Sequence, residues 1–117
     1  LHRSHLRQDW TVKPDAFIPH PWPDLSVTRH LQLSEPELWN IAKIVAKQTE
    51  KTLYGRVDVR ALDFERQTLR VVSTPVLENP NHASVSGWPV EKSAQKAIAQ
   101  EITQAAGQAR KAPPTSD

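Results

Sequence analysis

The sequence contains no cysteine, no methionine and only three glycines among its 117 residues. Without cysteine there is no disulfide framework, no thiolate nucleophile and no cysteine-based zinc site, and the lack of disulfides fits a cytoplasmic location. The glycines stand at positions 55, 87 and 107, which is not the pattern of a phosphate-binding loop. No apolar run approaches the ~20 residues of a membrane span, so we expect no membrane association.

Charges of both signs are nearly balanced, with 15 basic and 13 acidic residues and a formal net charge of +2. A nucleic-acid-binding domain usually carries a basic patch or stripe. Here acidic residues separate the arginines in the middle of the chain, which are Arg56, Arg60, Arg66 and Arg70. This spacing predicts a solvated face of mixed charge, and weak nucleic-acid binding through these arginines remains only an alternative.

Two consecutive stretches give clear local signals. Apolar and polar residues alternate over residues 25–33, which predicts a half-buried strand. A helix then starts after Ser34, because Ser34 and Glu37 have the spacing of a capping box, and it ends near residues 49–51. Its apolar stripe has three- and four-residue spacing and consists of Leu38, Ile41, Ala42 and Val45.

The second half of the chain supplies the remaining elements. Residues 57–67 fit either one arm of a hairpin or a short helix, and we favour a short helix followed by a strand over residues 69–73. A strand over residues 82–86 and a helix starting at residue 91 complete the set. The apolar stripe of that helix consists of Ala94, Ala97, Ile98, Ile102, Ala105 and Ala106.

These elements predict a single α+β domain over residues 25–109. A small sheet is covered on one face by two main helices, and a short helix connects them. In this arrangement Leu38, Ile41 and Val45 face Ile98 and Ile102.

Residues 1–24 combine prolines with large aromatic side chains. Prolines at positions 14, 19, 21 and 23 disfavour both a helix and a central strand, whereas Trp10, Phe17 and Trp22 are unfavourable to leave in water. We therefore expect an extended N-terminal arm, without helix, that holds Trp22 against an apolar surface of this protein or of a partner. At the other end, residues 110–117 are expected to form a disordered tail.

Residues 78–89, with the sequence ENPNHASVSGWP, contain the best candidate for chemistry. Asn79, Pro80 and Asn81 predict a turn whose amides satisfy backbone groups, and this turn aims His82 at the start of a strand. In the structural interpretation His82 is buried and hydrogen-bonded. In the catalytic interpretation it works with Arg29 and Asp58, because imidazole titrates near neutral pH. His2 and His5 have a possible metal-ligand spacing, but no further ligand accompanies them, so we predict no metal and no cofactor.

The order of these segments resembles a family of small uncharacterised bacterial proteins. They share a Leu-Ser-Val segment, here residues 25–27, and an Asn-Pro-x-His-Ala segment, here residues 79–83. The resemblance covers residues 10–106 and implies a bacterial origin, the same fold and a helix between residues 58 and 67. It implies no particular activity.

The sequence therefore favours a non-catalytic accessory or partner-binding protein of the bacterial cytoplasm, which contacts a larger protein through its aromatic arm and residues 78–89. Tryptophan is enriched at binding hot spots. The predicted partner-binding residues are accordingly Trp10, Phe17, Trp22 and Trp88. Two alternatives remain: the aromatic residues complete a small core, or the protein is a small enzyme that uses His82.

Overall fold

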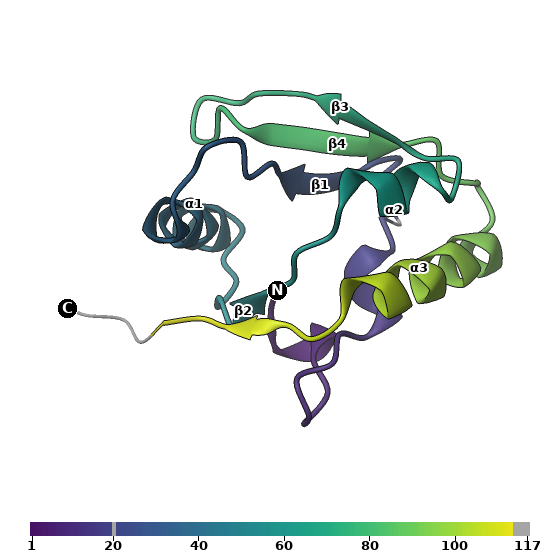
Figure 1. Ribbon diagram of the computed structural model, residues 1–117, viewed down its shortest axis with the longest axis horizontal. Coiled ribbons are helices and arrows are strands. Elements are labelled where there is room, and N and C mark those ends of the chain that lie inside the picture. The colour runs from purple at the N-terminus through teal and green to yellow at the C-terminus, as the bar shows by residue number, and fades with distance from the viewer. Residues whose placement is uncertain (20, 114–117) are drawn as a thin grey trace.

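The computed structural model describes residues 1–19 and 21–113 of the chain. Three antiparallel strands in the order β1-β4-β3 form the main sheet, and two further strands form a small second sheet (Figure 1). The strands are β1 (Leu25–Thr28), β2 (Gly55–Arg56), β3 (Arg70–Ser73), β4 (His82–Ser86) and β5 (Arg110–Lys111). The α-helices are α1 (Glu35–Gln48), α2 (Ala61–Glu65) and α3 (Lys92–Ala106), and two 3-10 turns, η1 (Arg3–His5) and η2 (Pro14–Phe17), precede them. None of the helices in the described residues is long and apolar enough to cross a membrane.

The two faces of the main sheet differ in chemistry because side chains alternate along each strand. On the central strand β4, Ala83 and Val85 are buried, whereas His82, Ser84 and Ser86 are only half-buried. Val85 lies opposite Leu25 on one side and Val71 on the other, so this row forms the inner face. The helices lie on that side of the sheet (Figure 1), which confirms the predicted α+β class.

The core forms where the inner face of the sheet meets α2, α3 and the N-terminal segment. Its buried cluster comprises Val12, Phe17, Phe64, Leu69, Val85, Trp88, Ala99 and Ile102. The Trp88 indole Nε1 donates a hydrogen bond to the Val85 carbonyl oxygen at 3.0 Å, which satisfies its polar group inside the core. The aromatic ring therefore joins the end of β4 to the start of the last helix.

Residues 1–24 do not form the extended, helix-free arm that the prolines suggested. Pro14 occupies the first turn of η2, where its missing N–H costs nothing, and this turn carries Phe17 into the core beneath α3. Val12 is fully buried as well. The segment is thus part of the domain, although Trp22 near its end is 72% exposed.

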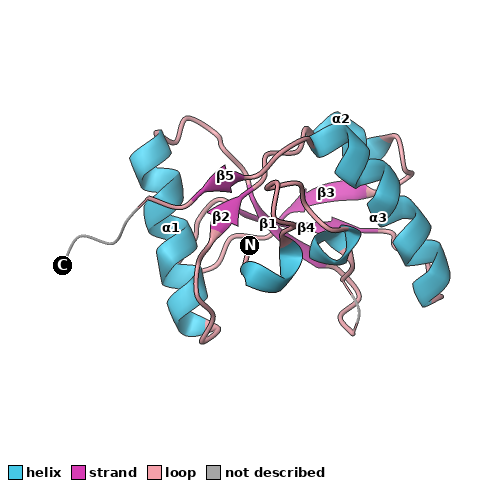
Figure 2. Ribbon diagram, turned by 90° about the horizontal axis from the view of Figure 1, so that it is seen from below, coloured by secondary structure: helices cyan, strands magenta, loops and turns pink. Residues whose placement is uncertain are grey.

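The predicted contact between the two long helices is wrong. Helices α1 and α3 lie at opposite ends of the molecule in both views (Figures 1 and 2). Helix α1 buries Trp39, while Val45 is 38% exposed, and Ile102 packs in the core cluster instead of against Leu38 or Ile41. The spacing of apolar residues identified a helix but not the surface against which it packs.

Several local predictions are confirmed. Ser34 and Glu37 form both hydrogen bonds of the capping box, α2 is a short helix, and β4 spans residues 82–86. The first strand ends five residues before its predicted end, because Leu31 and Gln32 adopt positive φ angles of 23° and 62° and form a turn.

The terminal segments meet at β2 and form a layer that we call the terminal clasp, comprising residues 1–12, 54–56 and 108–112. Tyr54 N donates to the Leu1 carbonyl, Ala112 N to the Tyr54 carbonyl, and Ala109 N to the Trp10 carbonyl, at 2.9–3.0 Å. A Cβ atom at Gly55 would lie 2.5 Å from the Arg110 carbonyl oxygen, so glycine is required for this close approach. Residues 110 and 111 of the predicted tail therefore form a strand, whereas residues 114–117 lie outside the described residues.

Candidate functional site

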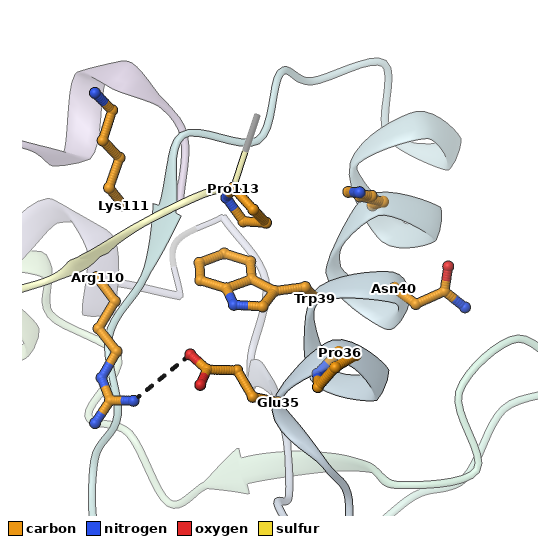
Figure 3. Close-up of a pocket in the computed structure, with 8 residues that line it drawn as sticks. Glu35, Pro36, Trp39, Asn40, Arg110, Lys111 and Pro113 are labelled. Atoms are coloured by element: carbon orange, nitrogen blue, oxygen red, sulfur yellow. Dashed lines mark ion pairs between the residues drawn. The ribbon is translucent and has the colours of Figure 1, made fainter. Parts of the chain in front are cut away.

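A shallow groove of about 630 Å³ lies between α1 and the C-terminal strand β5 (Figure 3). The first three turns of α1 form one wall, and β5 with Pro113 forms the other. Its lining residues are Glu35, Pro36, Trp39, Asn40, Lys43, Arg110, Lys111 and Pro113. We call this feature the α1/β5 groove.

Trp39 lies deep in the groove and is held from several sides. Its ring lies between Glu35 and Pro113 in Figure 3, and the residue is only 7% exposed. The Arg56 guanidinium carbon lies 5.1 Å from the centroid of the indole ring, a cation–π geometry. The buried Nη1 of Arg56 has no hydrogen-bond partner among the described residues, and the π face of Trp39 compensates for that loss.

Behind the groove, two carboxylates are each shared by two arginines. Glu35 Oε1 lies 3.5 Å from Arg56 Nη2 and 3.8 Å from Arg110 Nη1. Asp58 Oδ1 lies 3.4 Å from Arg56 Nε, and Asp58 Oδ2 lies 3.7 Å from Arg110 Nε. His30 Nε2 lies 3.2 Å from Asp58 Oδ1. We call these five residues the Asp58 network; it connects the start of α1 to β2 and β5.

The rim of the groove is positively charged. Lys43, Arg110 and Lys111 line it together with one acidic residue, Glu35, and Glu35 is already close to two guanidinium groups. None of the ion pairs among residues 1–19 and 21–113 involves either lysine. Both lysine side chains are exposed.

The residues of the predicted catalytic set lie in separate surroundings. His82 Nδ1 lies 2.9 Å from both the carbonyl oxygen and the hydroxyl oxygen of Thr74, so Thr74 fixes the orientation of this ring. Arg29 donates to Ser73 Oγ at 3.0 Å, and Asp58 belongs to the Asp58 network. Within the described part of the chain, no hydrogen bond or ion pair joins His82, Arg29 and Asp58. The imidazole beside Asp58 is that of His30.

The predicted turn at residues 79–81 is confirmed. Asn79 is 1% exposed, and its Nδ2 donates to Thr28 Oγ1 at 2.8 Å. Its Oδ1 accepts a hydrogen bond from the backbone N–H of Asn81, and Asn81 Nδ2 donates to the Arg29 carbonyl oxygen. The two amides connect the end of β1 to the start of β4, so the Asn-Pro-Asn segment has a structural role.

The predicted partner-binding aromatic residues lie in three different surroundings. Phe17 and Trp88 belong to the core, and Trp10 is half-buried against Gly55 in the terminal clasp. Trp22 is exposed and is not packed against an apolar surface of this chain. Trp39 is not among the predicted site residues, although one signal points to it: it stands four residues from both Glu35 and Lys43, which places a tryptophan between opposite charges on one side of a helix.

The two N-terminal histidines lie against each other, with ring centroids 3.7 Å apart. Burial, together with the nearby His2, lowers the pKa of His5 to about 4. No group of three or more metal-ligating side chains with suitable geometry occurs among the described residues.

Comparisons of this chain with protein-family models, with curated proteins and with solved structures find no match. Function is therefore inferred from the geometry and charge of the α1/β5 groove.

Proposed function

We propose that this protein is a partner-binding module whose α1/β5 groove holds an acidic, extended segment of a larger protein. The observation that supports this most directly is the charge of the groove: Lys43, Arg110 and Lys111 line it with a single carboxylate. Complementary charge guides such a segment to the site and fixes its register. The lack of cysteine and the resemblance to bacterial proteins support a role in a bacterial cytoplasm.

The shape of the groove fits a peptide in an extended or polyproline conformation. Such peptides dock in shallow apolar grooves, and here exposed Pro36 and Pro113 line opposite walls while the almost fully buried Trp39 lies between them. Asn40 supplies an amide at its wall that can hydrogen-bond a peptide backbone.

Single-stranded nucleic acid fits the groove less well. Proteins that bind it use aromatic side chains whose faces are open to stack on bases. Trp39 is 7% exposed and Arg56 covers a face of its ring, so stacking is blocked. The arginines that suggested nucleic-acid binding are also partly neutralised, since Arg60 and Arg66 both lie close to Asp63.

The test uses a labelled peptide of four Pro-Glu repeats, with a Pro-Gln peptide and an oligothymidylate as comparison probes. Binding is measured by fluorescence anisotropy at low and at physiological salt. A surface charge pair contributes roughly 0.2–1 kcal/mol. The K43E/K111E variant loses two attractions and gains two repulsions, so its affinity for the Pro-Glu peptide should fall by about tenfold.

The matched control is K92E/K96E, which makes the same charge change on exposed lysines of α3. It should bind the Pro-Glu peptide like the parent protein. Equal losses in both variants, or no binding of the Pro-Glu peptide, would refute the proposal. Tighter binding of oligothymidylate than of the peptide would favour the nucleic-acid alternative.

A further inference from the structure

Strand β3 forms one edge of the main sheet, and it pairs with β4 on one side only (Figure 1). A strand edge carries backbone N–H and C=O groups that can pair with another chain. Pairing therefore depends on which backbone groups of β3 point away from β4, and on which chain can place its own N–H and C=O groups opposite them.

The ladder between β3 and β4 identifies the open groups. Thr74 N donates to the His82 carbonyl oxygen. Because hydrogen bonding alternates along an antiparallel pair, Val72 and Arg70 also direct their backbone groups toward β4. Val71 and Ser73 therefore direct theirs away from it, to the open side of the sheet.

The side chains on this edge favour association more than those on β1, which forms the other edge. On the outer face of β3, Val72 is 44% exposed, whereas its counterpart on β1 is the polar Ser26. Beyond the strand, Val76 is exposed and Leu77 is 96% exposed. Val72 therefore gives the β3 edge an apolar outer residue where the β1 edge has a polar one.

We propose that β3 pairs with β3 of a second copy of this chain, antiparallel and across a two-fold axis at Val72. In this register Val71 of each copy lies opposite Ser73 of the other, so both open residues exchange hydrogen bonds. Val72 meets Val72 of the second copy on the outer face, and such apolar cross-strand pairs are favourable. Arg70 lies opposite Thr74 of the second copy, so the two arginines do not face each other.

In each neighbouring symmetric register one residue pair lacks a backbone N–H donor. An axis at Val71 would pair Ser73 with Leu69, whose N–H already donates to the Phe64 carbonyl oxygen at 3.2 Å. An axis at Ser73 would pair Val71 with Pro75, which has no N–H to donate. The register with the axis at Val72 is thus the one of these three in which both residues of every open pair can donate and accept.

The contact is small, because β3 has only four residues. Interfaces below about 1,200 Å² are typical of weak complexes, so the dimer forms at high protein concentration. It does not depend on the α1/β5 groove, and the proposed function can fail without affecting it.

Single cysteines test the register directly, since the chain has no cysteine of its own. In the proposed dimer the two Val72 Cα atoms are about 4.5 Å apart, which lies within the range that a disulfide spans. Arg70 is the matched control on the same face of the same strand, but its two Cα atoms are about 14 Å apart, at ~3.4 Å per residue along the strand. Under mild oxidation V72C should form a disulfide dimer at least tenfold faster than R70C. Equal rates would overturn the proposal.

Sedimentation equilibrium provides a second measurement. The parent protein should shift from 13.2 kDa toward twice that mass as its concentration rises. V72K, which places two like charges at the axis, should stay monomeric, whereas V90K, which changes another exposed valine, should behave like the parent. A parent protein that is still monomeric at about 1 mM, the weak end of specific association, or a V72K protein that still dimerises, would overturn the proposal.

Discussion

Replacing Asn79 with alanine removes the side chain that links the end of β1 to the start of β4. Asn79 is almost fully buried, and its amide makes two hydrogen bonds, one to Thr28 Oγ1 and one from the Asn81 N–H. Alanine can adopt the same backbone conformation before Pro80, so the substitution tests the amide and not the turn backbone.

The size of the effect follows from these two bonds. A hydrogen bond contributes about 1 kcal/mol net, and a buried partner left unpaired costs about 1–3 kcal/mol. The Asn81 N–H and the Thr28 hydroxyl lose their partner but are only half-buried. We expect N79A to lower the free energy of unfolding by about 2–4 kcal/mol, and the melting temperature by roughly 10 °C for a domain of this size.

Denaturant unfolding followed by tryptophan fluorescence measures this loss of stability. N79A should lower the denaturant concentration at the unfolding midpoint and leave the dependence of the unfolding free energy on denaturant concentration unchanged. N81A is the matched control: it removes one bond, to the Arg29 carbonyl oxygen, at a half-buried position and should cost about 1 kcal/mol. A double-mutant cycle with T28V should give a coupling of about 1 kcal/mol between Thr28 and Asn79. An N79A loss below about 0.5 kcal/mol, the size of an ordinary surface change, would refute this account of the turn.

Two further predictions concern the terminal clasp. G55A places a Cβ atom against the Arg110 carbonyl oxygen, so β2 and β5 must separate and stability should fall by about 1–3 kcal/mol in denaturant unfolding; unchanged stability would contradict the close approach. The pKa of His5 is about 4 in the folded protein, whereas an exposed histidine in the unfolded chain has a pKa of 6.5. Between these pH values the unfolded chain binds more protons than the folded protein, so the free energy of unfolding decreases as the pH falls from 6.5 toward 4. Because the ring is half-exposed, the loss should be about 1 kcal/mol, and H5Q should remove it; parallel pH profiles of both proteins would contradict the assignment.

The sequence predicted features that depend on neighbours along the chain. The capping box at Ser34, the turn at Asn79 and the extent of β4 are each fixed by residues within about five positions of one another. Pro14 shows the limit of such local signals: proline excludes the interior of a helix, but it is well suited to the first position of a short turn. For that reason the prediction of an extended, helix-free N-terminal arm is wrong.

The candidate site could not be predicted in the same way. Glu35, Arg56, Asp58 and Arg110 come from three separate segments, and the pairing of β2 with β5 brings Arg56 and Asp58 close to Arg110. Trp39 lies off the apolar stripe of its helix, and its burial depends on Arg56 from a distant strand. Periodicity identifies which residues share a face of a helix, but not what covers that face.

The terminal clasp also shapes how the molecule opens. Its hydrogen bonds join Trp10 to Ala109 and Tyr54 to Ala112, so the first and last parts of the described chain are held by one another and by β2. Fraying at one end removes the partner of the other end, and residues that are far apart in sequence exchange their amide hydrogens in a single opening event. The terminal clasp therefore forms one cooperative unit, which closes only after residues 108–112 have been synthesised.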